Sequence, residues 1–110
     1  MESKTGNVKE EATRYRLVQL SCENVTVTPE MAARWLADNP HNRPIRKERV
    51  DELCEKIRSG KWKLNPPIEV FDTGRLWNGQ HRLSAIVKTG RSVKMKVRTL
   101  SKIPEETIGQ

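Results

Sequence analysis

The sequence predicts one small α+β domain with a mixed sheet and about three helices. A chain of 110 residues is long enough for one hydrophobic core and too short for a second. Residues 50–57 place apolar side chains at helical spacing, whereas residues 93–98 alternate between apolar and basic side chains as a strand does. Such segments follow one another as strand, helix, loop, helix, hairpin, helix and strand, which is typical of an α+β domain.

The two ends of the chain differ in composition from its middle. Residues 1–13 are polar and have no apolar h-region, so we expect a disordered lead-in rather than a secretory signal. The domain is predicted to span residues 14–103, with residues 104–110 as a tail. No window approaches the ~18 apolar residues of a membrane span. We therefore expect a cytoplasmic protein without a membrane partner.

The first predicted strand covers residues 14–20, where Tyr, Leu and Val alternate loosely with polar residues. A helix is predicted to begin after Thr28, a suitable N-cap, with Pro29 at its first position, and to stop at Pro40. Residues 39–46 contain two prolines and two asparagines, so they are predicted to form a loop.

The clearest helical pattern begins at residue 47. Four apolar residues fall at i, i+3, i+4 and i+7 and predict a buried stripe, and Gly60 is expected to end the helix. The stripe consists of Val50, Leu53, Cys54 and Ile57. Cys54 is therefore expected to be a small buried hydrophobe rather than a nucleophile. The other cysteine is Cys22. Neither cysteine belongs to a metal-binding pattern, so no metal site is expected.

The second half of the chain predicts a hairpin followed by a helix. Residues 66–72 and 75–78 are two short strand patterns around a Thr-Gly turn. Asp72 is expected to contribute to that turn. The next helix is predicted to run from about Gly79 to Gly90, because both glycines suit helix ends.

The net charge of +7 is unevenly distributed. Residues 1–45 carry six Lys/Arg and six Asp/Glu, so the whole excess lies in residues 46–110. Residues 88–102 hold six basic residues and no acidic one, which favours a polyanionic partner. In the last predicted strand the apolar residues point one way and the basic ones the other. The basic ones, Lys94, Lys96 and Arg98, are therefore candidates for binding nucleic acid.

The stretch LWNGQHRLSA, residues 76–85, brings together groups that bind anions. A helix that starts here has unpaired N–H groups and a partial positive charge at its first turn. A glycine allows close approach of the backbone, and imidazole and guanidinium groups add donors. We therefore expect a phosphate site at Gly79, Gln80, His81 and Arg82. The alternative is a helix capped by Asn78, with the histidine and arginine facing water.

The segment GRLWNGQHRLSAI resembles the hallmark strand-to-helix turn of the ParB/sulfiredoxin superfamily. That turn carries Gly-Glu-Arg-Arg in ParB proteins and Gly-Cys-His-Arg in sulfiredoxins. NPHNRP, residues 39–44, is similar to the Asn-Pro loop of ParB-like domains, and residues 50–70 are similar to their following helix and Pro-Ile strand. The pattern looks closest to short ParB-like proteins of phages and mobile elements.

This resemblance implies a ParB/sulfiredoxin-like fold and a nucleotide site that the Asn-Pro loop shares. By position it nominates Asn42, Arg43 and Arg46, and Asn65 in the loop before the Pro-Ile strand is a further candidate. A nucleoside triphosphate with Mg²⁺ is the ligand that the resemblance suggests.

The sequence also departs from the family pattern at Gln80. Gln80 replaces the sulfiredoxin cysteine, so reduction of a sulfinic acid through that thiol is excluded. It also replaces the acidic ParB residue that helps to bind the metal-nucleotide, which weakens the case for metal-assisted turnover. No helix-turn-helix pattern follows residue 100, so we do not expect a complete partition protein.

Three classes of function remain open. The first is a nucleotide- or DNA-binding protein. The second is a ParB-like nuclease or phosphotransferase, for which His81 is the catalytic candidate and Asp51, Glu69 and Asp72 are the available carboxylates. The third is a phage or mobile-element protein that binds a host protein without catalysis. The tryptophans at positions 62 and 77 are expected to anchor the core, with base stacking as the lesser alternative.

Overall fold

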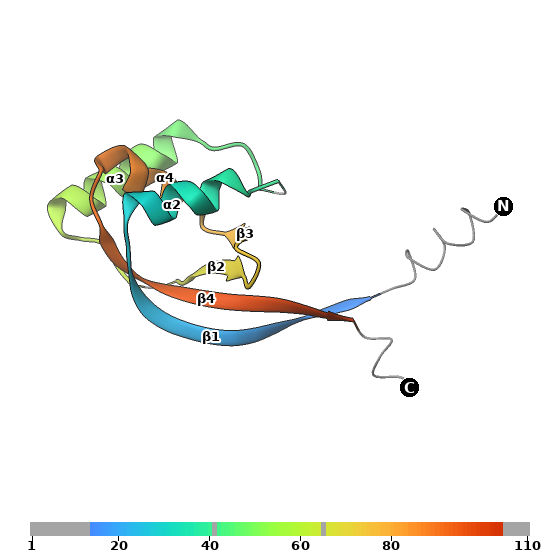
Figure 1. The fold of residues 1–110 in the computed structure, drawn as a ribbon. Coiled ribbons are helices and arrows are strands. Elements are labelled where there is room, and N and C mark those ends of the chain that lie inside the picture. Colours follow the sequence, from blue (N-terminus) through green and yellow to red (C-terminus); the bar gives the residue numbers. More distant parts are fainter. Residues whose placement is uncertain (1–13, 41, 65, 105–110) are drawn as a thin grey trace.

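The computed structural model describes residues 14–40, 42–64 and 66–104. Over these ranges the chain forms a four-stranded sheet in the order β1-β4-β2-β3. Three helices lie together on one face of that sheet (Figure 1). The elements are β1 (Tyr15–Val27), α2 (Pro29–Ala37), α3 (Lys47–Ser59), β2 (Ile68–Phe71), β3 (Leu76–Asn78), α4 (Gln80–Thr89) and β4 (Val93–Pro104). The predicted small α+β domain with a mixed sheet and three helices is therefore confirmed.

The sheet is mixed because β4 lies between an antiparallel and a parallel neighbour. β1 runs antiparallel to β4 from the Tyr15–Pro104 pair to the Val27–Val93 pair, with a bulge between Gln19 and Ser21. β2 runs parallel to β4, and β3 runs antiparallel to β2. Beyond the end of β2, strands β1 and β4 continue as a two-stranded ribbon toward the termini (Figure 1).

Two strands are longer than the sequence predicts. β1 begins near the expected start but continues through residues 21–27, where the sequence pattern shows no regular alternation. Pairing with β4 along its whole length supplies the backbone hydrogen bonds that sustain it. β4 likewise reaches Pro104, one residue beyond the predicted domain end. The predicted lead-in, residues 1–13, and the rest of the predicted tail, residues 105–110, lie outside the described residues.

The helix ends follow the local sequence. The Thr28 hydroxyl accepts a 3.1 Å hydrogen bond from the Met31 N–H, and Pro29 occupies the first helical position of α2, as expected. α2 ends at Ala37, three residues before Pro40, and Asp38 is its C-cap. Gly60 ends α3 in the left-handed conformation with φ of 75°. Each of these features was readable from the sequence, except the early end of α2.

The core lies between the helices and the sheet. The predicted stripe of α3 is buried, and Cys54 within it is 1% exposed. The other large, fully buried side chains come from every layer: Val27, Ile68, Leu76, Leu83, Ile86 and Met95. Cys22 on β1 is exposed and both cysteines are free. The core is thus shared between the helices and all four strands, as expected for one two-layer domain.

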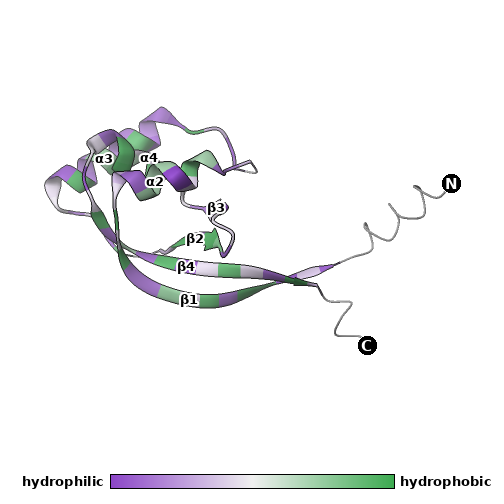
Figure 2. Ribbon diagram, in the orientation of Figure 1, coloured by the Kyte–Doolittle hydropathy of each residue, from purple (hydrophilic) through white to green (hydrophobic). Residues whose placement is uncertain are grey.

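The predicted alternation along β4 is also present. Val93, Met95 and Val97 are buried against the helices, and apolar and hydrophilic residues alternate along this strand in Figure 2. The basic residues between them therefore point to the opposite side of the sheet, which no helix covers (Figure 1). We call that uncovered side the open face. None of the helices in the described ranges has the length and apolar composition to cross a bilayer.

Candidate functional site

The candidate site begins where β3 turns into α4. Gly79 is the N-cap of α4, with φ of 121°, and no side chain caps the first turn. The expected alternative cap, Asn78, instead ends β3 and donates a 3.3 Å hydrogen bond to Glu69. The first-turn N–H groups of α4 are therefore not satisfied by a capping side chain, and the helix keeps the positive end that attracts anions.

Gly79 is required here by its neighbour in the core. A Cβ atom added to it would lie 2.5 Å from Cγ2 of Ile68 on β2, closer than real Cβ atoms approach. The positive φ also lies in a region that residues with a side chain rarely adopt. The sequence suggested that this glycine lets the backbone approach a ligand. The structure shows that it lets α4 approach β2.

Gln80 is buried, with 6% of its surface exposed, and both ends of its amide are bonded within the protein. Its Oε1 accepts a 2.8 Å hydrogen bond from Asn39, and its Nε2 donates to the main-chain carbonyl of Arg43. Asn42 donates in turn to the side chain of Asn39. Gln80 therefore fastens the Asn-Pro loop to the start of α4 and positions the site.

His81 is bonded to the same loop at its far end. The main-chain N–H of Arg46 donates a 3.0 Å hydrogen bond to Nε2 of His81, so this nitrogen is an acceptor and Nδ1 carries the proton of the neutral ring. Partial burial, followed by the nearby charges of Arg46 and Arg49, lowers the pKa of His81. A neutral imidazole whose Nε2 is already bonded is poorly placed to act as a general base through that nitrogen.

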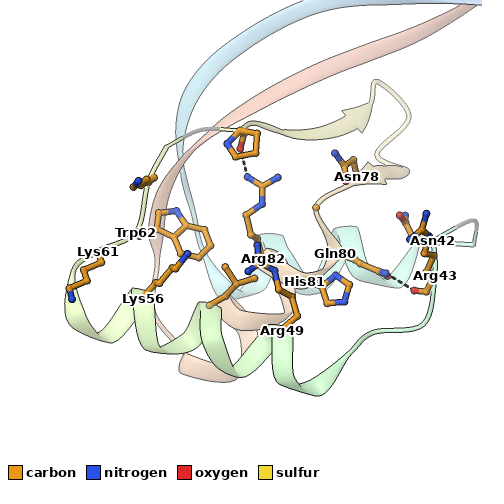
Figure 3. A pocket seen from close by; sticks show the side chains of 14 residues that line it. Asn42, Arg43, Arg49, Lys56, Lys61, Trp62, Asn78, Gln80, His81 and Arg82 are labelled. Atoms are coloured by element: carbon orange, nitrogen blue, oxygen red, sulfur yellow. Dashed lines mark hydrogen bonds between the residues drawn. The ribbon is translucent and has the colours of Figure 1, made fainter.

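Arg82 points away from His81 (Figure 3). Its Nη1 and Nη2 atoms donate to the carbonyls of Pro66 and Pro67, the second over 3.1 Å. Burial and the charge of Arg49 lower the pKa of Arg82, which Glu69 partly opposes. The expected bidentate grip is therefore directed at the main chain before β2. The guanidinium still contributes its positive charge to the wall of the site.

A cavity of about 570 Å³ lies between α3, the start of α4 and the segment before β2 (Figure 3). Its described lining holds no Asp or Glu. Arg49 makes a 3.3 Å ion pair with Glu52, and both partners are well exposed. Walls of one sign concentrate the electrostatic field and attract counter-ions. The basic side chains of the lining are Arg43, Arg49, Lys56, Lys61, Lys63 and Arg82.

Most of the predicted phosphate-site residues meet at this cavity. Asn42, Arg43 and all four residues from Gly79 to Arg82 line it, and Arg46 contacts His81 through its main chain. Asn65 lies outside the described residues. The structure thus joins the Asn-Pro loop to the strand-to-helix turn, although 35 positions separate the two partners of the His81 bond.

Sequence reasoning missed the cations that α3 and the following segment contribute. Arg49, Leu53 and Lys56 follow one another at i, i+4 and i+7, so they share one helix face that lines the cavity. Lys61 and Lys63 flank Trp62, which lines the cavity and also packs against the core. Both patterns were present in the sequence, but only the fold shows that they meet the start of α4.

The predicted nucleic-acid residues lie elsewhere, on β4. Lys94 is exposed and Lys96 is half-buried on the open face. Arg98 donates a 2.8 Å hydrogen bond to Glu69, and this bond raises the pKa of Arg98. None of these three residues is in the described lining of the cavity. Glu69 largely compensates the charge of Arg98. Of the three predicted residues, Lys94 and Lys96 therefore keep an uncompensated positive charge.

The carboxylates available for an enzyme are scattered. Asp51 bonds to Lys47 and Lys88 at 2.8 and 2.7 Å, and these bonds lower its pKa to about 2. Glu69 is held by Arg98, and Asp72 lies in the hairpin turn. Within the described ranges, no three His, Cys, Asp or Glu side chains gather as a metal site would need. The cavity lining therefore does not fit an Mg²⁺ ion held by protein carboxylates.

Comparisons with known proteins add nothing to this geometry: no family model, no curated protein and no solved structure matches the chain.

Proposed function

We propose that this protein is a ParB-like nucleotide- or DNA-binding protein that holds phosphate groups in the cavity beside the Gly-Gln-His-Arg turn. The observation that carries this proposal is the composition of the cavity wall, which combines six Lys/Arg side chains with no described carboxylate. The uncapped start of α4 adds the partial positive charge of a helix N-terminus to the same wall.

The size of the cavity favours a small ligand over a DNA duplex. About 570 Å³ lies within the range of roughly 300–1,000 Å³ typical of small-molecule sites. A nucleotide fits this volume, whereas a duplex would contact only its rim. A nucleoside triphosphate would bring about four negative charges, for which the wall supplies partners. Any Mg²⁺ that accompanies it would be bound through the phosphates rather than through carboxylates of this lining.

The residues of the site divide into two groups. Gln80, His81 and Arg82 hold the Asn-Pro loop and the segment before β2 in place, because their polar atoms are bonded to those main chains. The lysines and Arg49, whose charged ends are not tied to the main chain in this way, are proposed to contact the phosphates. The bonded loop supports the ParB-like assignment, since the resemblance implies that this loop and the turn share one site.

The geometry supports binding better than catalysis. Nε2 of His81 is occupied by the Arg46 N–H, and the candidate carboxylates of Asp51, Glu69 and Asp72 all lie outside the described lining. Asp51 and Glu69 are also held in ion pairs. A nuclease or phosphotransferase needs a base or metal ligands directed at the ligand. We therefore propose a binding protein in which the ligand acts without being turned over.

The experiment is a thermal-shift titration with CTP, ATP, GTP, UTP and inorganic triphosphate, each with and without Mg²⁺. A ligand that binds the folded state raises the melting temperature. A free ligand concentration of about 100 times Kd stabilises the folded state by roughly 2.7 kcal/mol. Arg49→Gln and Lys56→Gln should each reduce the shift. Arg58→Gln, an exposed residue of the same helix outside the described cavity lining, is the matched control.

The proposal fails if none of these ligands raises the melting temperature, or if the cavity variants behave as the Arg58 control does. A preference for one base would show that the cavity binds the nucleoside as well as the phosphates. Equal shifts for all four nucleotides and inorganic triphosphate would restrict the contacts to phosphate. Turnover of a nucleotide would overturn the choice of binding over catalysis.

A further inference from the structure

The open face of the sheet carries aromatic and basic residues together. Val97 and Met95 point to the helices, so the residues next to them along β4 point to the open face. The residues of β1 and β2 that pair with these β4 residues point to the open face as well. Glu69 and Phe71 on β2 share this face by their pairing with Arg98 and Leu100. Trp77 of β3 joins them, since its ring contacts Phe71.

Three aromatic rings and one lysine form a chain of contacts on this face. Phe71 and Trp77 stack edge to face, with ring centroids 5.5 Å apart and planes inclined by 70°. Nζ of Lys102 lies 5.5 Å from the centroid of Phe71 and 5.9 Å from that of Tyr15. Phe71 is buried, whereas Trp77 is 43% and Tyr15 is 55% exposed. The ring of Phe71 is therefore covered, whereas the rings of Trp77 and Tyr15 are accessible to solvent.

The exposure of Trp77 corrects the expectation that it anchors the core. Leu76, its neighbour on β3, is 2% exposed and occupies the core position instead. The exposed part of the indole is a large, flat ring surface that is accessible to a ligand. Trp62, by contrast, packs against the core as expected and also lines the cavity.

The charge of the open face is positive. Lys94, Lys96, Arg98 and Lys102 lie on it along β4. Glu69 is the carboxylate that the described strand pairings place there, and Arg98 neutralises it through their 2.8 Å bond. Three lysines remain without an acidic partner in the described ion pairs. An anionic partner would balance these charges, whereas an apolar one would bury them unpaired.

We infer that the open face binds single-stranded nucleic acid, with bases stacked on Trp77 and Tyr15 and phosphates placed against Lys94, Lys96 and Lys102. Exposed rings can stack only on unpaired bases, because the bases of a duplex are already stacked on each other. The rings belong to β3 and β1, which two strands separate, and Phe71 and Lys102 lie between them. That separation suits an extended strand that crosses the sheet.

This inference rests on the nucleic-acid part of the proposed function and adds the strandedness of the ligand and the stacking residues. It uses a different surface, since the described cavity lining contains neither ring. The cavity variants Arg49→Gln and Lys56→Gln therefore separate the two ideas. They should impair triphosphate binding and leave the affinity of the open face for a single strand within about twofold.

The test is a fluorescence titration of the full chain with a single-stranded oligothymidylate of about 12 nucleotides, a length that spans a typical site. A hairpin duplex of the same total charge serves as the competitor. We expect tryptophan quenching and tighter binding of the single strand. Trp77→Leu should weaken binding about tenfold or more and abolish most of the quenching, because base stacking is lost. Trp77→Phe, which keeps a ring, should restore most of the affinity.

The charged residues are tested with Lys94→Gln combined with Lys96→Gln. This variant should reduce the dependence of log K on log salt by roughly 0.7 for each phosphate contact removed. Arg58→Gln removes one charge from the opposite layer and should leave that slope unchanged. Circular dichroism of each variant distinguishes lost binding from lost folding.

Three results would overturn the inference. One is the absence of binding to the single strand by a folded wild-type chain. Another is equal or tighter binding of the duplex with no effect of Trp77→Leu, which would indicate a phosphate-only surface. The last is concentration-dependent self-association in sedimentation experiments that Trp77→Leu abolishes, which would assign the rings to a second copy of the chain.

Discussion

The main-chain N–H of Arg46 donates a 3.0 Å hydrogen bond to Nε2 of His81, and this bond joins the N-cap of α3 to the first turn of α4. It fixes the tautomer of the histidine and holds one end of the Asn-Pro loop, while Gln80 holds the other end. The cavity keeps its shape because these two consecutive residues are bonded to a loop that is distant in sequence.

The partial burial of His81 and the charges of Arg46 and Arg49 beside it predict that stability falls in mild acid. The pKa of His81 is lowered in the folded state, so the unfolded chain binds more protons between that lowered pKa and the ordinary value of 6.5. The free energy of unfolding should therefore decrease as the pH falls from 6.5 through the folded pKa. Melting temperatures measured across this range should show a shallower slope for His81→Gln, whose amide oxygen can still accept from Arg46. An unchanged slope would contradict this account.

Among the glycines that the structure describes, Gly79 should be the one whose change to alanine is most destabilising. The new Cβ would clash with Ile68 and force a strained φ, each costing about 1–3 kcal/mol. Gly60→Ala is the matched control, because its positive φ is similar in kind but its Cβ would meet nothing within 4 Å. It should cost about 1 kcal/mol. Urea unfolding of the two variants checks the difference, and equal losses would refute the close packing of α4 on β2.

Gln80→Ala should loosen the Asn-Pro loop. The change removes two part-buried hydrogen bonds that tie the loop to α4, so we expect a loss of about 2 kcal/mol. Gln19→Ala, on the exposed part of β1, should change stability by less than about 0.5 kcal/mol. Amide hydrogen exchange should become faster at Arg43 and its neighbours in the Gln80 variant alone. Unchanged exchange would show that the amide does not fasten this loop.

The bonds of Asp51 predict a second decrease in stability, at a more acidic pH. Bonds to Lys47 on α3 and Lys88 on α4 lower its pKa from 3.8 to about 2, so the stabilisation is present above 3.8 and is lost as the pH falls toward 2. The group is exposed, so the effect should be small and sensitive to salt. Asp51→Asn should flatten the melting-temperature profile in this range at low salt and have little effect near 1 M NaCl. A difference that persists at high salt would argue against an ion-pair origin.

The two cysteines should differ sharply in reactivity. Cys22 is exposed on β1, whereas Cys54 is buried with its thiol directed at the carbonyl of Ala85, 3.9 Å away. A thiol reagent should therefore modify one cysteine in the folded chain and both in denaturant. Cys22→Ser should abolish the fast phase without changing stability. A native chain that reacts at both thiols would contradict the packing of α3 against α4.

Much of the fold was predictable because local patterns determined its elements. The stripe from Val50 to Ile57 identified α3, and the Thr28–Pro29 pair identified the start of α2. The length of β1 was not predictable, since residues 21–27 become a strand only by pairing with β4. Tertiary pairing decides such segments, and single-sequence patterns do not contain it.

The candidate site was predictable in its location but not in its division of roles. The Gly-Gln-His-Arg turn and the Asn-Pro loop do meet, yet Gln80 and Arg82 bond to main-chain carbonyls that no sequence pattern marks. Arg49 and Lys56 reach the cavity from a helix for which the sequence predicted only the buried apolar stripe. The exposure of Trp77 was likewise hidden, because a tryptophan beside a leucine on a short strand suits either side of a sheet.

The pairing of β1 has a consequence for how the chain is made. β1 has β4 as its neighbour in the described sheet, and their contact joins Tyr15 to Pro104. On the ribosome, β1 therefore emerges long before the strand that completes it, and Val27, which is fully buried in the folded domain, stays uncovered until then. Assembly of this sheet is thus a late, cooperative event that follows synthesis of β4, and a chaperone that shields β1 in the meantime should raise the yield of native protein.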